Sequence, residues 1–69
     1  MNKVQKTIIR QMAKGYTQRE VAEYLKQRNM HPNSLSTVEK EVNKLKKALG
    51  AQTTVHLFVL LIKQGILKA

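Results

Sequence analysis

The 69-residue sequence contains no cysteine, one proline, no tryptophan and only three aromatic residues in all. Without cysteine, disulfide bonds, cysteine-ligated zinc and thiol chemistry are excluded, and a reducing compartment is acceptable. The longest uninterrupted apolar run covers residues 57–62, whereas a membrane-spanning helix needs roughly 20 residues. Lys3, Lys6 and Arg10 interrupt the first apolar cluster, so no signal peptide is recognisable. We therefore expect a cytoplasmic protein that does not enter a membrane.

Carboxylates are scarce: four glutamates stand against thirteen lysines and arginines, and the formal net charge is +9. With 42% hydrophobic residues the chain has the composition of a folded protein, and its length allows one domain, residues 1–69. So short a chain has little material for both a core and a cleft, so we expect neither an enzyme nor a small-molecule substrate. His31 and His56 lack nearby ligands, so we also expect no metal and no cofactor. The most economical partner of such a cationic domain is a polyanion.

Four segments combine helical apolar spacing with capping residues, which predicts an all-α fold of four helices. We expect these helices over residues 2–14, 17–27, about 36–49 and 53–64. Asn2 with Gln5, and Thr17 with Glu20, have the spacing of capping boxes. The third helix starts at Ser34 or Ser36, since Ser36 with Glu39 has the same spacing. The expected helix ends are marked by Gly15, Gly50 and Gly65, with Pro32 in the break before the third helix.

The third predicted helix has two different faces. Val38, Val42, Leu45 and Leu49 recur at helical spacing and form one apolar stripe. The opposite face carries a polar and cationic ridge made of Ser36, Lys40, Asn43, Lys44 and Lys47. Lysine reaches phosphates or guanine, asparagine can pair with adenine, and a serine near a helix start can meet a phosphate. The ordinary alternative is a solvated face that only keeps the protein soluble.

The fourth predicted helix is apolar around most of its circumference, so we expect it to be buried on more than one side. If Leu57, Phe58, Leu61 and Ile62 face the core, then Val59, Leu60 and Leu67 remain for another surface. We predict that these three residues contribute to a two-fold homodimer interface. The alternative is that they are ordinary exposed apolar side chains.

Several segments resemble the LuxR/GerE-type helix-turn-helix domain of bacterial transcription factors. The similar segments are residues 12–22 (MAKGYTQREVA), 34–38 (SLSTV), 44–51 (KLKKALGA) and 61–67 (LIKQGIL). They follow the family's order over nearly the whole chain: a first helix ending in glycine, a scaffold helix, the start of a recognition helix, its close and a final helix. The resemblance implies a four-helix DNA-binding domain whose third helix enters the major groove and whose fourth helix often packs against a second copy.

Carried over by position, the resemblance implies phosphate contacts at Thr37 and Lys44. It implies base contacts at Glu39, Lys40 and Asn43, of which Lys40 and Asn43 also lie on the cationic ridge. Glu39 lies off the centre of the ridge, although a carboxylate can accept a hydrogen bond from cytosine. Ser36 and Lys47 complete the predicted phosphate contacts from the ridge itself.

The sequence departs from the family pattern in three places. Eight residues separate Leu25 from Ser34 where the family has about two, which predicts an elongated turn between the second and third helices. Glu41 stands where the family often has histidine, and Ala48 stands in place of the lysine before Leu-Gly. Lys47 is adjacent and can compensate for that lysine.

The sequence therefore predicts sequence-specific binding of double-stranded DNA in bacterial transcriptional regulation, with the third helix in the major groove. We expect a homodimer, formed either in solution or only on DNA. Two alternatives remain open: a non-catalytic interaction or dimerisation module that uses the apolar fourth helix, and an RNA-binding protein.

Overall fold

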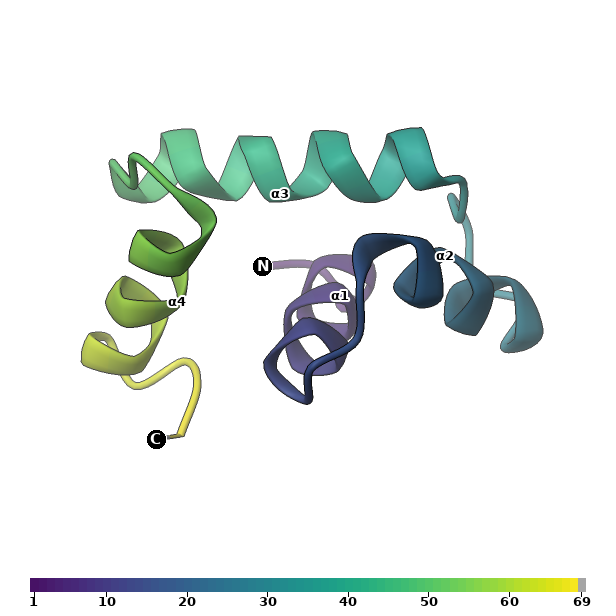
Figure 1. Cartoon of the computed structure of the whole chain (residues 1–69), viewed down its shortest axis with the longest axis horizontal. Helices are drawn as coiled ribbons and strands as arrows, with labels where there is room; N and C mark the ends of the chain where they lie inside the picture. Colours follow the sequence, from purple (N-terminus) through teal and green to yellow (C-terminus); the bar gives the residue numbers. More distant parts are fainter. Residues whose placement is uncertain (69) are drawn as a thin grey trace.

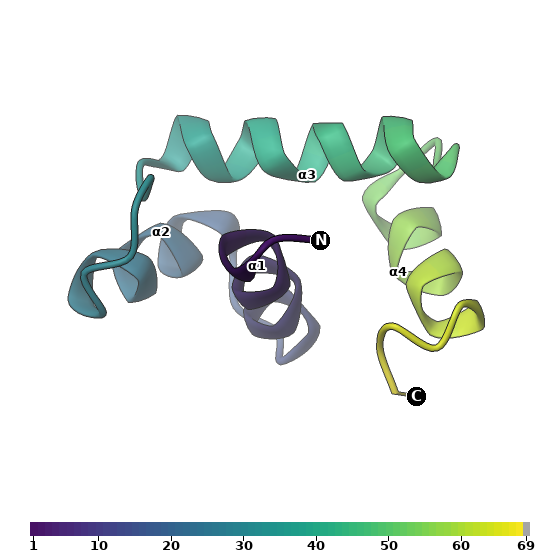
Figure 2. The same ribbon diagram turned by 180° about the vertical axis from the view of Figure 1, so that it is seen from behind.

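The computed structural model describes residues 1–68, which form four α-helices and no strand, so the predicted all-α class is confirmed. The helices are α1 (Lys3–Ala13), α2 (Gln18–Gln27), α3 (Leu35–Leu49) and α4 (Thr54–Lys63). α3 lies along one side of the molecule, and the other three helices lie together on its opposite side, as the views from front and back both show (Figures 1 and 2). Within residues 1–68, one long side of α3 is therefore left without a neighbouring helix.

The first two helices begin at the predicted capping boxes. Asn2 Oδ1 accepts a hydrogen bond from the Gln5 backbone at 2.8 Å, and Gln5 Oε1 accepts one from the Asn2 backbone at 3.2 Å. Thr17 and Glu20 exchange the equivalent pair at 3.2 and 2.9 Å. These reciprocal bonds satisfy backbone donors that a helix start leaves without partners, so both predictions are confirmed.

The start of α3 distinguishes between the two candidate caps. Ser34 Oγ accepts from the Thr37 backbone at 3.1 Å, and the helix begins at Leu35. The predicted capping box of Ser36 with Glu39 is wrong, since both residues lie inside the helix, which begins one residue before the expected 36. A start at Leu35 places that side chain within the first turn, where it packs against the core.

All four helices end with a residue at positive φ: Gly15, Asn29, Gly50 and Gly65. At the end of α3, Gly50 has φ +73°, and the Ala51 N–H donates to the Lys46 carbonyl at 2.8 Å. α2 ends in the same way with Asn29 at φ +52°, and the Met30 N–H donates to the Leu25 carbonyl at 2.9 Å. These bonds are those of the Schellman motif, in which a left-handed residue lets the chain turn back and satisfy terminal carbonyls.

The connection between α2 and α3 spans residues 28–34. Met30 packs against the core, and the Asn33 side-chain amide donates to the Met30 carbonyl at 3.0 Å. The chain between Leu25 and Ser34 is thus divided between a longer α2, which reaches Gln27, and an ordered seven-residue connection. Its conformation is held by an apolar anchor and a local hydrogen bond.

One apolar core joins all four helices. It consists of Ile8, Ile9, Val21, Ala22, Leu25, Val38, Val42, Leu45, Leu57 and Leu61. α2 packs against α3, and both contribute core residues at the spacing of one helix face: Val21 and Leu25 from α2, Val38 and Val42 from α3. Removing this apolar area from water is the main force that holds the helices together.

The expectation that α4 is buried on more than one side is wrong. Only Leu57 and Leu61 of this helix are buried, while Val55 is 75% exposed, Val59 42% and Ile62 41%. The arrangement considered from the sequence had Ile62 facing the core, but in the structure Ile62 is exposed. α3 is the main helix packed against α4, and the far side of α4 has no covering element within residues 1–68 (Figure 1).

No single helix in residues 1–68 is both long and apolar enough to cross a bilayer. α3 and α4 meet the length and composition criteria only as a pair, across a bend of 57°.

Candidate nucleic-acid interface

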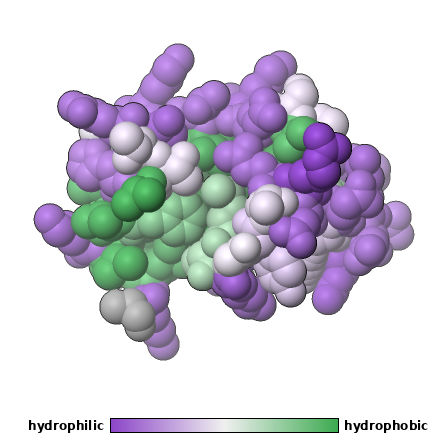
Figure 3. All heavy atoms as spheres, in the orientation of Figure 1, coloured by the Kyte–Doolittle hydropathy of each residue, from purple (hydrophilic) through white to green (hydrophobic). Residues whose placement is uncertain are grey.

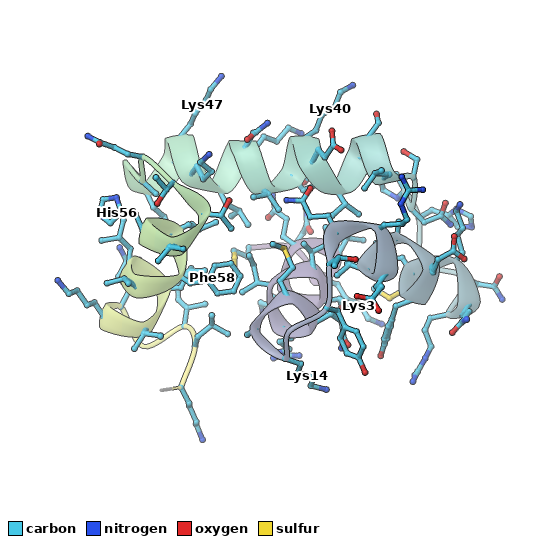
Figure 4. All side chains as sticks on the ribbon, in the orientation of Figure 1. Lys3, Lys14, Lys40, Lys47, His56 and Phe58 are labelled. Carbon is cyan, nitrogen blue, oxygen red and sulfur yellow. The ribbon has the colours of Figure 1, made fainter. Side chains whose placement is uncertain are left out.

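α3 is a rod whose two faces differ in burial. Its apolar stripe lies in the core, with Val38 0%, Val42 2% and Leu45 6% exposed. The residues of the opposite face, which we call the α3 ridge, are all exposed: Ser36, Lys40, Asn43, Lys44 and Lys47. Figure 4 shows Lys40 and Lys47 extending in a common direction, away from the other helices. Fifteen residues at 1.5 Å per residue make this rod about 22 Å long.

The α3 ridge concentrates charge at a cost to its own helix. Lys40 and Lys44 are four residues apart, and Lys44 and Lys47 are three apart, spacings at which like charges weaken a helix. Within residues 1–68, Lys40, Asn43 and Lys47 make no side-chain hydrogen bond or ion pair. Their polar groups are therefore turned to solvent and open to an external acceptor such as phosphate or a base edge.

Lys44 differs from its neighbours on the ridge because a carboxylate holds it. Its Nζ lies 3.2 Å from Glu41 Oε2, and Glu41 Oε1 accepts a hydrogen bond from the Gln5 side chain at 3.0 Å. The Glu41 side chain is only 12% exposed, whereas that of Lys44 is 69% exposed. Lys44 is thus tethered at the junction of α1 and α3, and its ammonium group remains accessible to a phosphate.

The remaining predicted contact residues on α3 flank the ridge. Thr37 is half-buried, and its Oγ1 lies 2.9 Å from Ser34 Oγ, so its hydroxyl belongs to the cap of the helix. Glu39 is exposed on the other flank, about 100° around the helix from Lys40. The structure therefore brings Ser36, Lys40, Asn43 and Lys47 together and places Thr37 and Glu39 to either side.

The three predicted dimer residues do not lie in one exposed patch. Val59 is exposed, Leu60 is half-buried, and Leu67 packs against the core. A shallow apolar groove lies instead beside the exposed face of α4, lined by Met12, Thr54, Val55, Phe58, Val59 and Ile62. Figure 3 shows apolar surface gathered over α4 and the region between α4 and α1, whereas the α3 edge is mostly hydrophilic.

Three features of these surfaces were not predicted from the sequence: the Gln5–Glu41 hydrogen bond, the apolar groove and the Glu41–Lys44 ion pair. The hydrogen bond between Gln5 and Glu41 joins residues 36 positions apart, and no local pattern indicates such a contact. The contribution of Val55 and Ile62 to the apolar groove was missed because α4 is apolar on most sides, and periodicity alone does not show which side is covered. The spacing of Glu41 and Lys44 at i and i+3 was a usable signal for their ion pair.

Within residues 1–68, no three His, Asp or Glu side chains come together as a metal site requires. Comparisons of the chain with protein-family models, with curated proteins and with solved structures gave no match. The α3 ridge and the apolar groove beside α4 are thus the two surfaces that bear on function.

Proposed function

We propose that this chain is a sequence-specific DNA-binding domain of the LuxR/GerE helix-turn-helix type, acting in bacterial transcriptional regulation. α3 is the recognition helix, and α2 supports it from behind. The observation that carries the proposal is the α3 ridge: a polar and cationic face, about 22 Å long, with no helix of the described residues beside it. A major groove about 12 Å wide and 8.5 Å deep accepts a single helix presented in this way.

The binding mechanism has two stages. The net charge of +9 attracts the duplex and releases counterions from its phosphates, whatever the sequence. Lys40 and Asn43, in the middle of the ridge, then read base edges, while Glu39 reaches bases from the flank. Phosphate contacts from Ser36, Thr37, Lys44 and Lys47 set the position of α3 in the groove. No catalysis and no cofactor take part in this mechanism.

The long connection between α2 and α3 is compatible with this assignment. The family pattern has a shorter turn, but here α2 extends to Gln27 and residues 28–34 are anchored by Met30 in the core. Both helices still meet through Val21, Leu25, Val38 and Val42, the faces expected for a scaffold helix and a recognition helix.

Selection of bound duplexes from a random pool tests the proposal directly. We expect an enriched sequence, and a palindromic one if two copies bind together. Contact with five to seven phosphates predicts a slope of about −4.5 to −6 for the logarithm of affinity against that of salt concentration. No enrichment together with a flat salt dependence would contradict the proposal, and preference for structured RNA at equal salt would favour RNA binding instead.

The apolar groove beside α4 favours a second candidate function, a non-catalytic interaction or dimerisation module. Val55, Val59 and Ile62 are exposed together beside the half-buried Phe58. Self-association through this groove agrees with the DNA-binding proposal, because a two-fold dimer reads two half-sites. If the groove is instead the main working surface, DNA binding will be weak and insensitive to changes at Lys40 and Asn43.

A further inference from the structure

A second row of cations lies on α1 and its C-terminal cap. Lys3, Lys6, Arg10 and Lys14, which we call the α1 ridge, are all exposed, and the helix contains no carboxylate. The α3 sequence has four lysines against two glutamates, a net charge of +2, whereas the α1 ridge contributes +4. The segment with the greatest excess of positive charge is therefore not the proposed recognition helix.

The pattern of positive charges on α1 destabilises this helix. Lys6 and Arg10, like Arg10 and Lys14, are four residues apart, a spacing at which like charges repel. The first turn contains Lys3 and no acidic residue, although the helix dipole favours negative charge there. Within residues 1–68, none of the four cations forms an ion pair. An arrangement that weakens the helix and has no internal partner points to an external anion.

The α1 ridge faces away from α3. On an ideal helix Lys3, Arg10 and Lys14 project within about 40° of one another, and Gln5 lies about 160° from Lys3. The Gln5 side chain donates to Glu41 of α3, so Gln5 marks the side of α1 that faces α3. In Figure 4, Lys40 and Lys47 extend upward from α3 at the top, whereas Lys3 lies near the middle of the molecule below α3 and Lys14 lies at the bottom.

One duplex does not reach both ridges. The Cα positions extend over 31 × 21 × 19 Å, and the core of the domain separates α3 from the outer face of α1. DNA has a persistence length of about 150 base pairs, so folding a duplex back around a body of this size carries a large deformation cost. When α3 holds one duplex, the α1 ridge is left facing away from it.

We infer that the α1 ridge binds the phosphate backbone of a second duplex segment, so that one copy of the protein bridges two stretches of DNA. This inference rests on the proposed function, because α3 must hold the first duplex. The occupant follows from charge: four exposed cations in one row, on a helix without a carboxylate, attract a phosphate backbone whatever its sequence. Its binding is therefore independent of sequence, whereas that of the α3 ridge depends on sequence.

A bridging assay tests the inference. A duplex with the preferred site is attached to beads, the full chain is added, and recovery of a second, fluorescent duplex of unrelated sequence is measured. The test variant carries Lys3→Gln, Lys6→Gln and Arg10→Gln, and the matched control carries Arg19→Gln, Lys63→Gln and Lys68→Gln. Both lose three charges from exposed positions, and circular dichroism checks that both remain helical.

We expect the α1 variant to recover roughly tenfold less second duplex than the control, with an equal affinity for a single duplex. Unchanged recovery would overturn the inference and leave the proposed function intact, since a dimer presenting two α3 ridges also bridges. A loss of single-duplex affinity beyond that of the control would overturn it too, by assigning the α1 ridge to the first duplex. If the unaltered chain binds a single duplex but recovers no second one, the inference alone fails; if it binds no duplex, the proposed function fails as well.

Discussion

Gln5 Nε2 donates a 3.0 Å hydrogen bond to Glu41 Oε1, which joins the first turn of α1 to the middle of α3. The same Gln5 side chain accepts from the Asn2 backbone in the capping box, and the other Glu41 oxygen holds Lys44. A continuous polar chain thus runs from the N-terminus of α1 to the edge of the α3 ridge. It aligns two helices whose main connection is otherwise apolar.

Exchanging the amide of Gln5 and the carboxylate of Glu41 tests the contribution of this hydrogen bond to stability. Gln5→Glu keeps the capping box and puts a favourable charge at a helix start, but it places two carboxylates together. We expect the free energy of unfolding to fall by about 1–2 kcal/mol, since the carboxylate of Glu41 loses its donor. Adding Glu41→Gln restores one donor and one acceptor, so the double variant should recover most of the loss in urea unfolding. Additive effects of the two substitutions would show that the contact contributes nothing.

The left-handed helix ends predict effects of different size for two substitutions. Gly50→Ala puts a β-carbon on a residue at φ +73°, which costs about 1–2 kcal/mol. Apart from Gly50 and its two chain neighbours, no atom of residues 1–68 lies within 4 Å of an added β-carbon, so the loss comes from backbone conformation. Asn29→Gly, at φ +52°, relieves that strain and should change stability by less than about 1 kcal/mol. Thermal unfolding of both variants measures the difference, and equal effects would contradict it.

Base reading and phosphate contact on the α3 ridge predict different specificities. Lys40→Ala or Asn43→Ala should weaken binding to the selected site by about 1–3 kcal/mol and affect random duplex much less. Lys47→Ala should weaken both equally and reduce the salt slope by about 1. Lys63→Ala, at the far end of α4, is the matched control for lost charge. Equal losses on both duplexes for Lys40→Ala and Asn43→Ala would show that these residues touch only phosphate.

The different surroundings of neighbouring residues on α4 predict which substitutions affect association and which affect folding. Val59→Glu changes a side chain that is 42% exposed beside the apolar groove, so we expect a folded monomer of nearly unchanged stability. Leu60→Glu changes a half-buried side chain and should lower the free energy of unfolding by about 1–3 kcal/mol. Sedimentation equilibrium and urea unfolding separate the two results. A Val59→Glu variant that stays dimeric would exclude the groove as the interface.

Local sequence determined where α1 and α2 begin and where α1, α3 and α4 end. Capping residues and left-handed glycines act within a few positions, and an apolar repeat of 3.6 residues decides which side of α3 is buried. The two faces of α3 were therefore predictable. The choice between Ser34 and Ser36 was not, because both have the chemistry of a cap and the outcome depends on Leu35 packing against the core.

Only the tertiary structure decided which side of α4 stays uncovered, how Glu41 is used, and that the two cationic ridges face opposite ways. Each of these depends on the direction in which one helix meets another. Burial of apolar area stabilises the packing of helices but has no preferred direction. The sequence of an almost uniformly apolar helix such as α4 therefore does not indicate which face its neighbours will cover. The same holds for Gln5 and Glu41, which become partners only after α1 and α3 have packed.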